Sequence, residues 1–353
     1  MPTRSRARLA TALAVVAAML LAGCGGDDET EPTASEDGVT DSKLRLGYFP
    51  NFTHAPALIG VENGIFAEHL GQVELETTTF NAGPEAIQAL FAGAVDATFI
   101  GPNPSINGFA QSGGEALRVV SGAAANGAFL VVRKDIDSPE DLVGTTLATP
   151  QLGNTQDVAL RFWLLDQGYE TSEAGGGDVS ITPMSNGETL SAFASGAIDG
   201  GWLPEPWATR LVAEGGAHVL VDEADLWPDG TFVTTQLIVS TEYLDENPAL
   251  VERLIAGELE AVEFIESDPE AAQVVVNDAI EALTGDPIDP ALLAAAWENV
   301  EFTVDPVAGS LLTGAEHAEA VGLLDPVDLD ALYDLGSLNN VLEEAGEDEV
   351  SAG

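Results

Sequence analysis

One segment of this chain recurs at a fixed offset. Residues 90–100 read LFAGAVDATFI, and residues 193–203, 103 positions later, read FASGAIDGGWL. Asn51 and Asn154 are related by the same shift. In both stretches an apolar helical segment leads through Gly-Ala-Val/Ile-Asp into a short apolar strand. Because internal self-similarity usually reports repeated supersecondary units, the chain is predicted to contain two similar α/β lobes facing a shared cleft.

The remaining strand and helix signals extend this prediction to a two-lobed α/β fold. Residues 44–49 predict a first strand, and two later apolar strands, residues 129–133 and 232–239, are predicted to cross between the lobes as a hinge. In open α/β sheets, ligands bind beyond the carboxyl ends of the strands. The predicted boundaries are residues 43–128 and 233–345 for lobe I and residues 129–232 for lobe II.

The amino terminus is typical of a targeting segment. Three arginines precede an apolar run at residues 9–21, which is too short for an ordinary membrane span. The following Leu-Ala-Gly-Cys24 resembles the lipobox of bacterial lipoproteins; an unprocessed anchor and a plain secretory signal are the alternatives. We expect a signal peptide at residues 1–23, a lipid anchor on Cys24 at the outer face of the cytoplasmic membrane, an acidic disordered tether at residues 24–42 and a disordered tail at residues 346–353.

The charge of the chain restricts its partners. With 59 acidic and 11 basic residues the net charge is −48, which excludes nucleic acid as a partner. Such a chain repels itself unless salt screens the repulsion, and at about 1 M salt the screening length falls to about 3 Å. The sequence therefore indicates a halophilic source, and most of its carboxylates are expected to be solvated surface groups.

The reactive residues do not favour catalysis. Cys24 is the only cysteine, so no disulfide, cysteine metal site or catalytic thiol is available in the folded part. The four histidines (His54, His69, His218 and His317) lack metal-binding spacing, and no Gly-x-Ser-x-Gly elbow is present. We expect a binding protein with no catalytic residues, metal or cofactor.

Four motifs, in order along residues 44–240, carry a family resemblance: LGYFPN at 46–51 followed by THAP at 53–56, GPNP at 101–104, ATPQLGNTQD at 148–157 and WLPEPW at 202–207. They resemble the solute-binding proteins of bacterial ABC importers, in the branch that handles nitrate, taurine and aliphatic sulfonates and includes thiamine-pyrimidine binders. The resemblance implies a type II periplasmic-binding-protein fold that closes on one small molecule. It also implies a monomer that docks transiently on ABC permease subunits.

The resemblance leaves the ligand open. A small anion, an aliphatic sulfonate or taurine, is the preferred ligand; nitrate, bicarbonate and a thiamine pyrimidine precursor are alternatives. Two hypotheses from other functional classes also stay open. One is a pyrimidine-synthase-like enzyme on the same fold, and the other is a surface lipoprotein that binds another protein.

Neutral hydrogen-bond donors at strand ends and helix starts are the expected anion site, because basic residues are almost absent from the four motifs. Trp202 is expected to supply an aromatic wall, and Trp207 to pack in the lobe or hinge. Glu205 is expected to recognise an amine or hydroxyl, or alternatively to pair with Arg210. The predicted ligand-binding residues are Asn51, Thr53, His54, Asn103, Asn126, Gln151, Asn154, Thr155, Gln156, Trp202 and Glu205.

Overall fold

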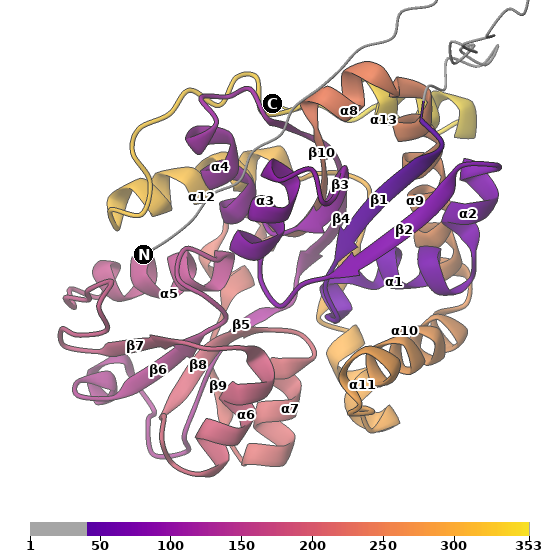
Figure 1. The fold of residues 1–353 in the computed structure, drawn as a ribbon. Coiled ribbons are helices and arrows are strands. Elements are labelled where there is room, and N and C mark those ends of the chain that lie inside the picture. The colour runs from indigo at the N-terminus through magenta and orange to yellow at the C-terminus, as the bar shows by residue number, and fades with distance from the viewer. Residues whose placement is uncertain (1–40, 353) are drawn as a thin grey trace, which may run out of the picture. The chain divides into compact units, whose positions relative to one another are not determined.

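The computed structural model describes residues 41–352, which lie within one compact unit of the chain, residues 34–353. The predicted signal peptide (1–23), Cys24, which is predicted to be lipidated, and nearly all of the predicted tether lie outside the described residues. Two β-sheets organise the described part (Figure 1). We call the six-stranded sheet with its helices lobe I, and the five-stranded sheet with its helices lobe II.

The strands of lobe I are β1 (Lys43–Tyr48), β2 (Glu74–Thr79), β3 (Ala97–Ile100), β4 (Leu117–Asn126), β10 (Val233–Ser240) and β11 (Val300–Phe302). Its helices are η1 (Phe52–His54), α1 (Ala55–Glu62), α2 (Ile65–Leu70), α3 (Gly83–Phe91), α4 (Pro102–Gln111), α8 (Thr241–Glu246), α9 (Pro248–Ser267), α10 (Pro269–Thr284), α11 (Pro290–Trp297), α12 (Ala308–Ala320) and α13 (Gly336–Ala345). The strands of lobe II are β5 (Ala128–Val132), β6 (Thr146–Thr149), β7 (Ser180–Pro183), β8 (Gly200–Pro204) and β9 (His218–Asp222). Its helices are η2 (Pro139–Leu142), α5 (Thr155–Asp166), α6 (Asn186–Ala194), α7 (Trp207–Gly215), η3 (Glu223–Leu226) and η4 (Pro228–Gly230). Among residues 41–352, no helix is long and apolar enough to cross a bilayer.

The sheet order confirms the repeat predicted from the sequence. Lobe I is ordered β11-β4-β10-β3-β1-β2 and lobe II β7-β6-β8-β5-β9. In lobe I, β1 pairs in parallel with β2 and β3, and in lobe II, β6 pairs in parallel with β7 and β8. Helices α3 and α6 begin 103 residues apart and end 103 residues apart. Each lobe therefore contains the same β-α-β-α-β unit with the same strand neighbours.

The repeated aspartate has the same structural role in both lobes. Asp96 Oδ2 accepts a hydrogen bond from the backbone N–H of Arg45 on β1 at 2.7 Å, and Asp199 Oδ2 accepts one from the N–H of Thr146 on β6 at 2.7 Å. Each carboxylate also pairs with an arginine, Arg45 for Asp96 and Arg133 for Asp199. The aspartate thus ties the first strand of each repeated β-α-β-α-β unit to the loop before its third strand.

Two chain segments cross between the lobes. β4 passes into β5 through Gly127, and the chain returns before β10. Asn126 and Gly127 have positive φ angles of 64° and 74°. A Cβ at Gly127 would lie 2.5 Å from the Val300 side chain, so both the backbone conformation and the space favour glycine. Asn126 Oδ1 accepts the N–H of Phe232 at 3.2 Å, which ties the outgoing segment to the returning one.

The carboxyl-terminal helices pack on lobe I. Leu250, Leu254 and Leu338 are fully buried in its main hydrophobic core. The sequence predicts a disordered tail at residues 346–353, but in the structure part of this segment is held in place. Val350 exchanges two hydrogen bonds with the side chain of Asn339, at 2.9 and 3.1 Å, and packs against the same core. These contacts hold Val350 against lobe I.

Candidate functional site

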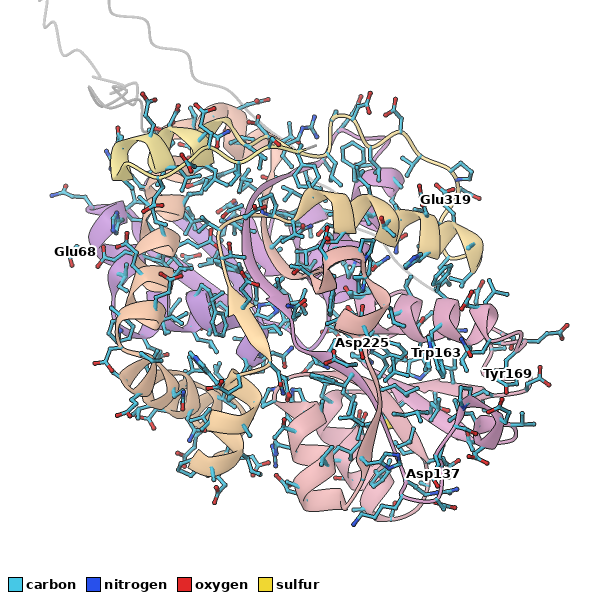
Figure 2. The ribbon with its side chains drawn as sticks, turned by 180° about the vertical axis from the view of Figure 1, so that it is seen from behind. Glu68, Asp137, Trp163, Tyr169, Asp225 and Glu319 are labelled. Atoms are coloured by element: carbon cyan, nitrogen blue, oxygen red, sulfur yellow. The ribbon has the colours of Figure 1, made fainter. Side chains whose placement is uncertain are left out.

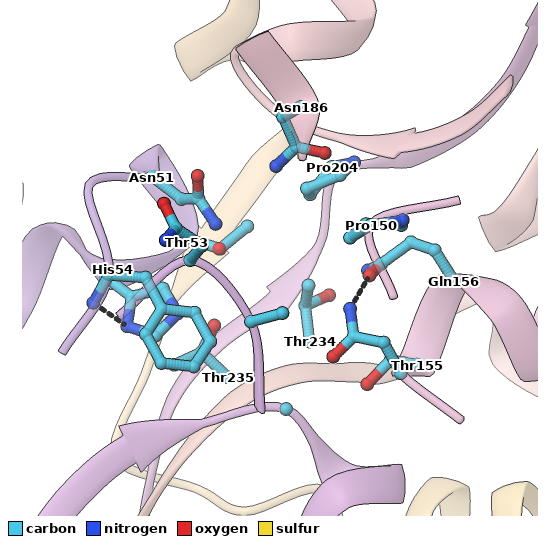
Figure 3. A pocket seen from close by; sticks show the side chains of 15 residues that line it. Asn51, Thr53, His54, Pro150, Thr155, Gln156, Asn186, Pro204, Thr234 and Thr235 are labelled. Atoms are coloured by element: carbon cyan, nitrogen blue, oxygen red, sulfur yellow. Dashed lines mark hydrogen bonds between the residues drawn. The ribbon is translucent and has the colours of Figure 1, made fainter. Parts of the chain in front are cut away.

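A cavity lies between the two lobes at the carboxyl ends of their strands (Figure 3). Lobe I contributes the loops after β1, β2 and β3 and two threonines of β10; lobe II contributes the loops after β6, β7 and β8. The lining residues are Phe49, Asn51, Thr53, His54, Asn81, Ala82, Gly101, Pro150, Asn154, Thr155, Gln156, Asn186, Pro204, Thr234 and Thr235. His54 is the only titratable side chain among them, and none is a lysine, arginine, aspartate or glutamate.

Helix α5 points its amino terminus at the cavity. Asn154 is its N-cap residue, and its side chain makes no capping bond to the helix. Helix geometry leaves the first-turn amides of Thr155 and Gln156 without intrahelical acceptors, and the helix dipole makes this end partly positive. Thr155 Oγ1 is buried and has no partner among residues 41–352. An acceptor placed here would satisfy donors that are otherwise costly to bury.

A buried ion pair fixes the start of α5. Asp157, fully buried, accepts hydrogen bonds from Thr149 Oγ1 at 2.8 Å and from the N–H of Gly153 at 3.0 Å. Arg161, one turn later on the helix, donates to the same carboxylate at 2.9 Å. Asp157 and Arg161 neutralise each other within lobe II. This ion pair therefore holds the loop before α5 in place and does not line the cavity.

His54 is neutral at physiological pH. Burial lowers its pKa from 6.5 to about 3. The N–H of Phe49 donates to His54 Nδ1 at 3.3 Å, and the two rings stack with centroids 4.4 Å apart. Because Nδ1 accepts, the ring proton is on Nε2, which is then available as a donor. His54 therefore adds a neutral N–H to the site.

Hydrogen bonds join the lobes across the cavity. Trp207 Nε1 of lobe II donates to Asn51 Oδ1 of lobe I at 2.8 Å, and the N–H of Gly83 of lobe I donates to Asn154 Oδ1 of lobe II at 3.4 Å. Trp207, expected to pack in the lobe or hinge, is buried and also spans the cleft. The Asn51 and Asn154 loops thus meet in one hollow.

Six of the predicted ligand-binding residues line this cavity: Asn51, Thr53, His54, Asn154, Thr155 and Gln156. In Figure 3 the first three lie on one side and the last two labelled residues, Thr155 and Gln156, on the opposite side. Asn154 Nδ2 donates to Gln156 Oε1 at 2.9 Å, so the two amides orient one another.

The other five lie outside the lining. Asn103 donates to the carbonyl of Gly314, and Asn126 belongs to the crossing segment. Gln151 follows the lining Pro150, and its buried Oε1 has no hydrogen-bond partner among residues 41–352. Trp202 is fully buried in the core of lobe II and donates from Nε1 to Glu223 at 2.7 Å. The sequence repeat aligns Trp202 with Phe99, which is equally buried, so this position is a core position in both lobes.

Glu205 binds protein groups with both carboxylate oxygens. It accepts from the N–H and Oγ1 of Thr209 and, across the lobes, from Asn299 Nδ2 at 2.6 Å. Burial raises its pKa. The alternative pairing with Arg210 is wrong, because Arg210 donates to Glu214 and Asp286 instead. Glu205 therefore contributes a further inter-lobe contact.

The sequence analysis missed four polar lining residues. Asn81 and Asn186 follow β2 and β7, and the Ser185–Glu188 capping box at the start of α6 was an available signal for the second. Thr234 and Thr235 lie on β10, where the apolar pattern hid them. Asn186 Oδ1 and Thr235 Oγ1 are, like Thr155 Oγ1, buried without a partner among residues 41–352. In that part of the chain no group of three or more His, Cys, Asp or Glu is placed to hold a metal ion.

Comparisons with known proteins place this geometry in context. Residues 37–279 match the NMT1-like family. A Brucella abortus protein provisionally described as a binding protein is 30% identical over 230 residues, covering 64% of this chain and 68% of that protein. The taurine-binding periplasmic protein of Escherichia coli is 23% identical over 61% of this chain and 64% of its own length. The solved structure of the alkanesulfonate-binding protein SsuA from Xanthomonas axonopodis pv. citri, bound to MOPS, superimposes with a TM-score of 0.67 at 20% identity, over 81% of this chain and 95% of that one.

Proposed function

The chain belongs to the NMT1-like family, and from that premise we propose that it is the solute-binding component of an ABC importer whose ligand is a small aliphatic sulfonate such as taurine. The observation that carries the proposal is the uncharged cavity between the lobes. Its lining of neutral polar groups with a few apolar side chains suits a small molecule. The binding roles named in relatives, for taurine and alkanesulfonates, support the ligand class.

A sulfonate fits the donors that the cavity offers. It stays a monoanion at any physiological pH, and its three oxygens only accept hydrogen bonds. The cavity presents donors from the amino terminus of α5, from Asn51 and from His54 Nε2, and no cationic side chain. A dianion would be costly to bury without a cation beside it. Phe49, Pro150 and Pro204 supply apolar surface for a short carbon chain.

The proposal includes capture without reaction. We infer that the ligand is released unchanged to permease subunits, since the cavity holds no nucleophile paired with a base. We also propose that the chain is a monomer anchored to the outer face of the cytoplasmic membrane through lipidated Cys24. Mass spectrometry of the amino-terminal peptide tests this anchor, and Cys24→Ala should move the protein from the membrane fraction to the soluble fraction.

Calorimetric titration tests the ligand. The full chain is titrated in high salt, which its charge of −48 is expected to require, with taurine, ethanesulfonate, nitrate, bicarbonate and an aminopyrimidine. Asn154→Ala/Thr155→Ala should weaken sulfonate binding at least tenfold. The control Asn63→Ala/Thr78→Ala makes the same chemical changes at exposed positions outside the cavity and should leave binding unchanged.

Each outcome of the titration decides a part of the proposal. Tighter binding of nitrate, bicarbonate or the pyrimidine overturns the sulfonate assignment. Equal sulfonate affinity in wild type and Asn154→Ala/Thr155→Ala overturns the site. Recovery of a chemically altered ligand after incubation overturns the inference that the chain only binds.

A further inference from the structure

A second cavity, which we call the rear cavity, lies between α5, η3 and α12. Its volume is about 210 Å³, and none of its lining residues lines the cavity described above. The lining residues are Ala159, Phe162, Trp163, Asp166, Glu223, Leu226, Trp227 and His317. Figure 2, seen from behind, labels Trp163 on α5 and Asp225 on η3 in this region. Its walls come from both lobes and from the segment between them.

The rear cavity is lined mainly by aromatic rings. Phe162 of α5 stacks on His317 of α12 with ring centroids 3.6 Å apart, and the Trp227 ring lies 5.3 Å from His317. Trp163 completes the aromatic part of the wall. Burial lowers the pKa of His317 to about 4, so the imidazole is neutral at pH 7 and does not repel a cation.

A buried carboxyl group lies in the same wall without a cationic partner. Glu223 is 1% exposed and accepts a hydrogen bond from Trp202 Nε1 at 2.7 Å. It forms no ion pair with any residue in 41–352, and no lysine or arginine lines the rear cavity. Asp166 adds a second carboxylate at the exposed rim. A buried carboxyl group without a positive partner resists ionisation, and a cation bound beside it would favour the ionised form, so this wall complements a cation.

We propose that the rear cavity binds a small organic cation with a methylated ammonium group. Faces of tryptophan, phenylalanine and similar rings attract such cations within about 6 Å of the ring centre. The methyl groups make contact with the aromatic wall, and the positive charge compensates Glu223 and Asp166. This binding site is additional to the anion site, and the proposal does not depend on which anion the first cavity takes.

Choline is the probe, and its neutral isostere 3,3-dimethylbutan-1-ol is the matched ligand control. Calorimetry of the full chain at constant chloride should show choline binding at least tenfold tighter than the alcohol. Glu223→Gln should reduce this preference at least fivefold, with little effect on the alcohol. Asp225→Asn removes the same charge from an exposed position of η3 outside the cavity wall and should leave choline affinity unchanged.

Aromatic variants test the ring contribution. Trp227→Ala should weaken choline binding at least tenfold, whereas Trp227→Phe, which keeps a ring, should lose less than the alanine variant. Circular dichroism establishes that each variant is folded, and Trp227→Phe serves if Trp227→Ala is not. Equal affinities for choline and the alcohol, or equal effects of Glu223→Gln and Asp225→Asn, would overturn the proposal. Because choline and taurine are titrated separately on the same wild-type chain, either proposal can fail while the other stands.

Discussion

Replacing Glu223 by glutamine should change how stability depends on pH. Burial raises the pKa of Glu223 from 4.5 to about 7. Between these two values the folded chain holds a proton that the unfolded chain has released, so stability falls as pH rises from 4.5 through 7. At about 1.4 kcal/mol per pKa unit, the loss reaches about 3 kcal/mol above pH 7. Glutamine mimics the protonated carboxyl and cannot lose a proton.

The expected result is a difference in the free energy of unfolding between Glu223→Gln and wild type that grows as pH rises. Near pH 4.5 wild type and Glu223→Gln should have similar free energies of unfolding, whereas at pH 8 the variant should be more stable by up to about 3 kcal/mol. Urea unfolding at both pH values, in high salt and without organic cations, measures this difference. Glu258, another buried carboxyl whose pKa is raised by burial, is present in both proteins and cancels in the difference. A difference of the same size at pH 4.5 and pH 8 would refute the reasoning.

Two further substitutions test the cavity and its support. A Cβ at Gly101 would lie 2.4 Å from Thr155 Oγ1, so Gly101→Ala should hold the lobes apart and weaken sulfonate binding at least tenfold in calorimetry. Gly187→Ala, where a Cβ meets nothing within 4 Å, is the control and should bind normally. Arg161→Met leaves Asp157 buried without its partner and should cost about 3–5 kcal/mol in urea unfolding. Adding Asp157→Leu to Arg161→Met should restore part of the lost free energy of unfolding, because it removes the unpaired charge. If stability is not restored, the loss comes from altered packing and not from the unpaired carboxylate.

The sequence predicted the fold well because its signals are local or repeated. The 103-residue offset aligned the helix and strand of one lobe with those of the other, and strand-end loops located Asn51 and Asn154 on the cavity wall. Trp202 was misplaced because its position at a strand end suggested exposure to the ligand, although its counterpart Phe99 is a core residue.

The inter-lobe contacts could not be predicted in the same way, because each depends on partners far apart in the chain. Asn299 reaches Glu205 from 94 residues away, and Trp207 reaches Asn51 from 156 residues away. Thr235 was hidden within an apolar strand, because the strand pattern shows alternation but not which residues meet the opposite lobe. Pairing of this kind follows only from the folded arrangement of the two sheets.

The hydrogen bonds between the two crossing segments have a mechanical consequence. Asn126 Oδ1 holds the N–H of Phe232, and Thr234 Oγ1 donates to the carbonyl of Asn126, so the two connections cannot slide past each other. The two bonds therefore tie the outgoing and returning segments together where the chain passes between the lobes. Trp227 of the rear cavity stacks on Phe232 with ring centroids 5.6 Å apart. An occupant of the rear cavity that moves Trp227 would therefore act directly on Phe232, the residue whose N–H is bound by Asn126.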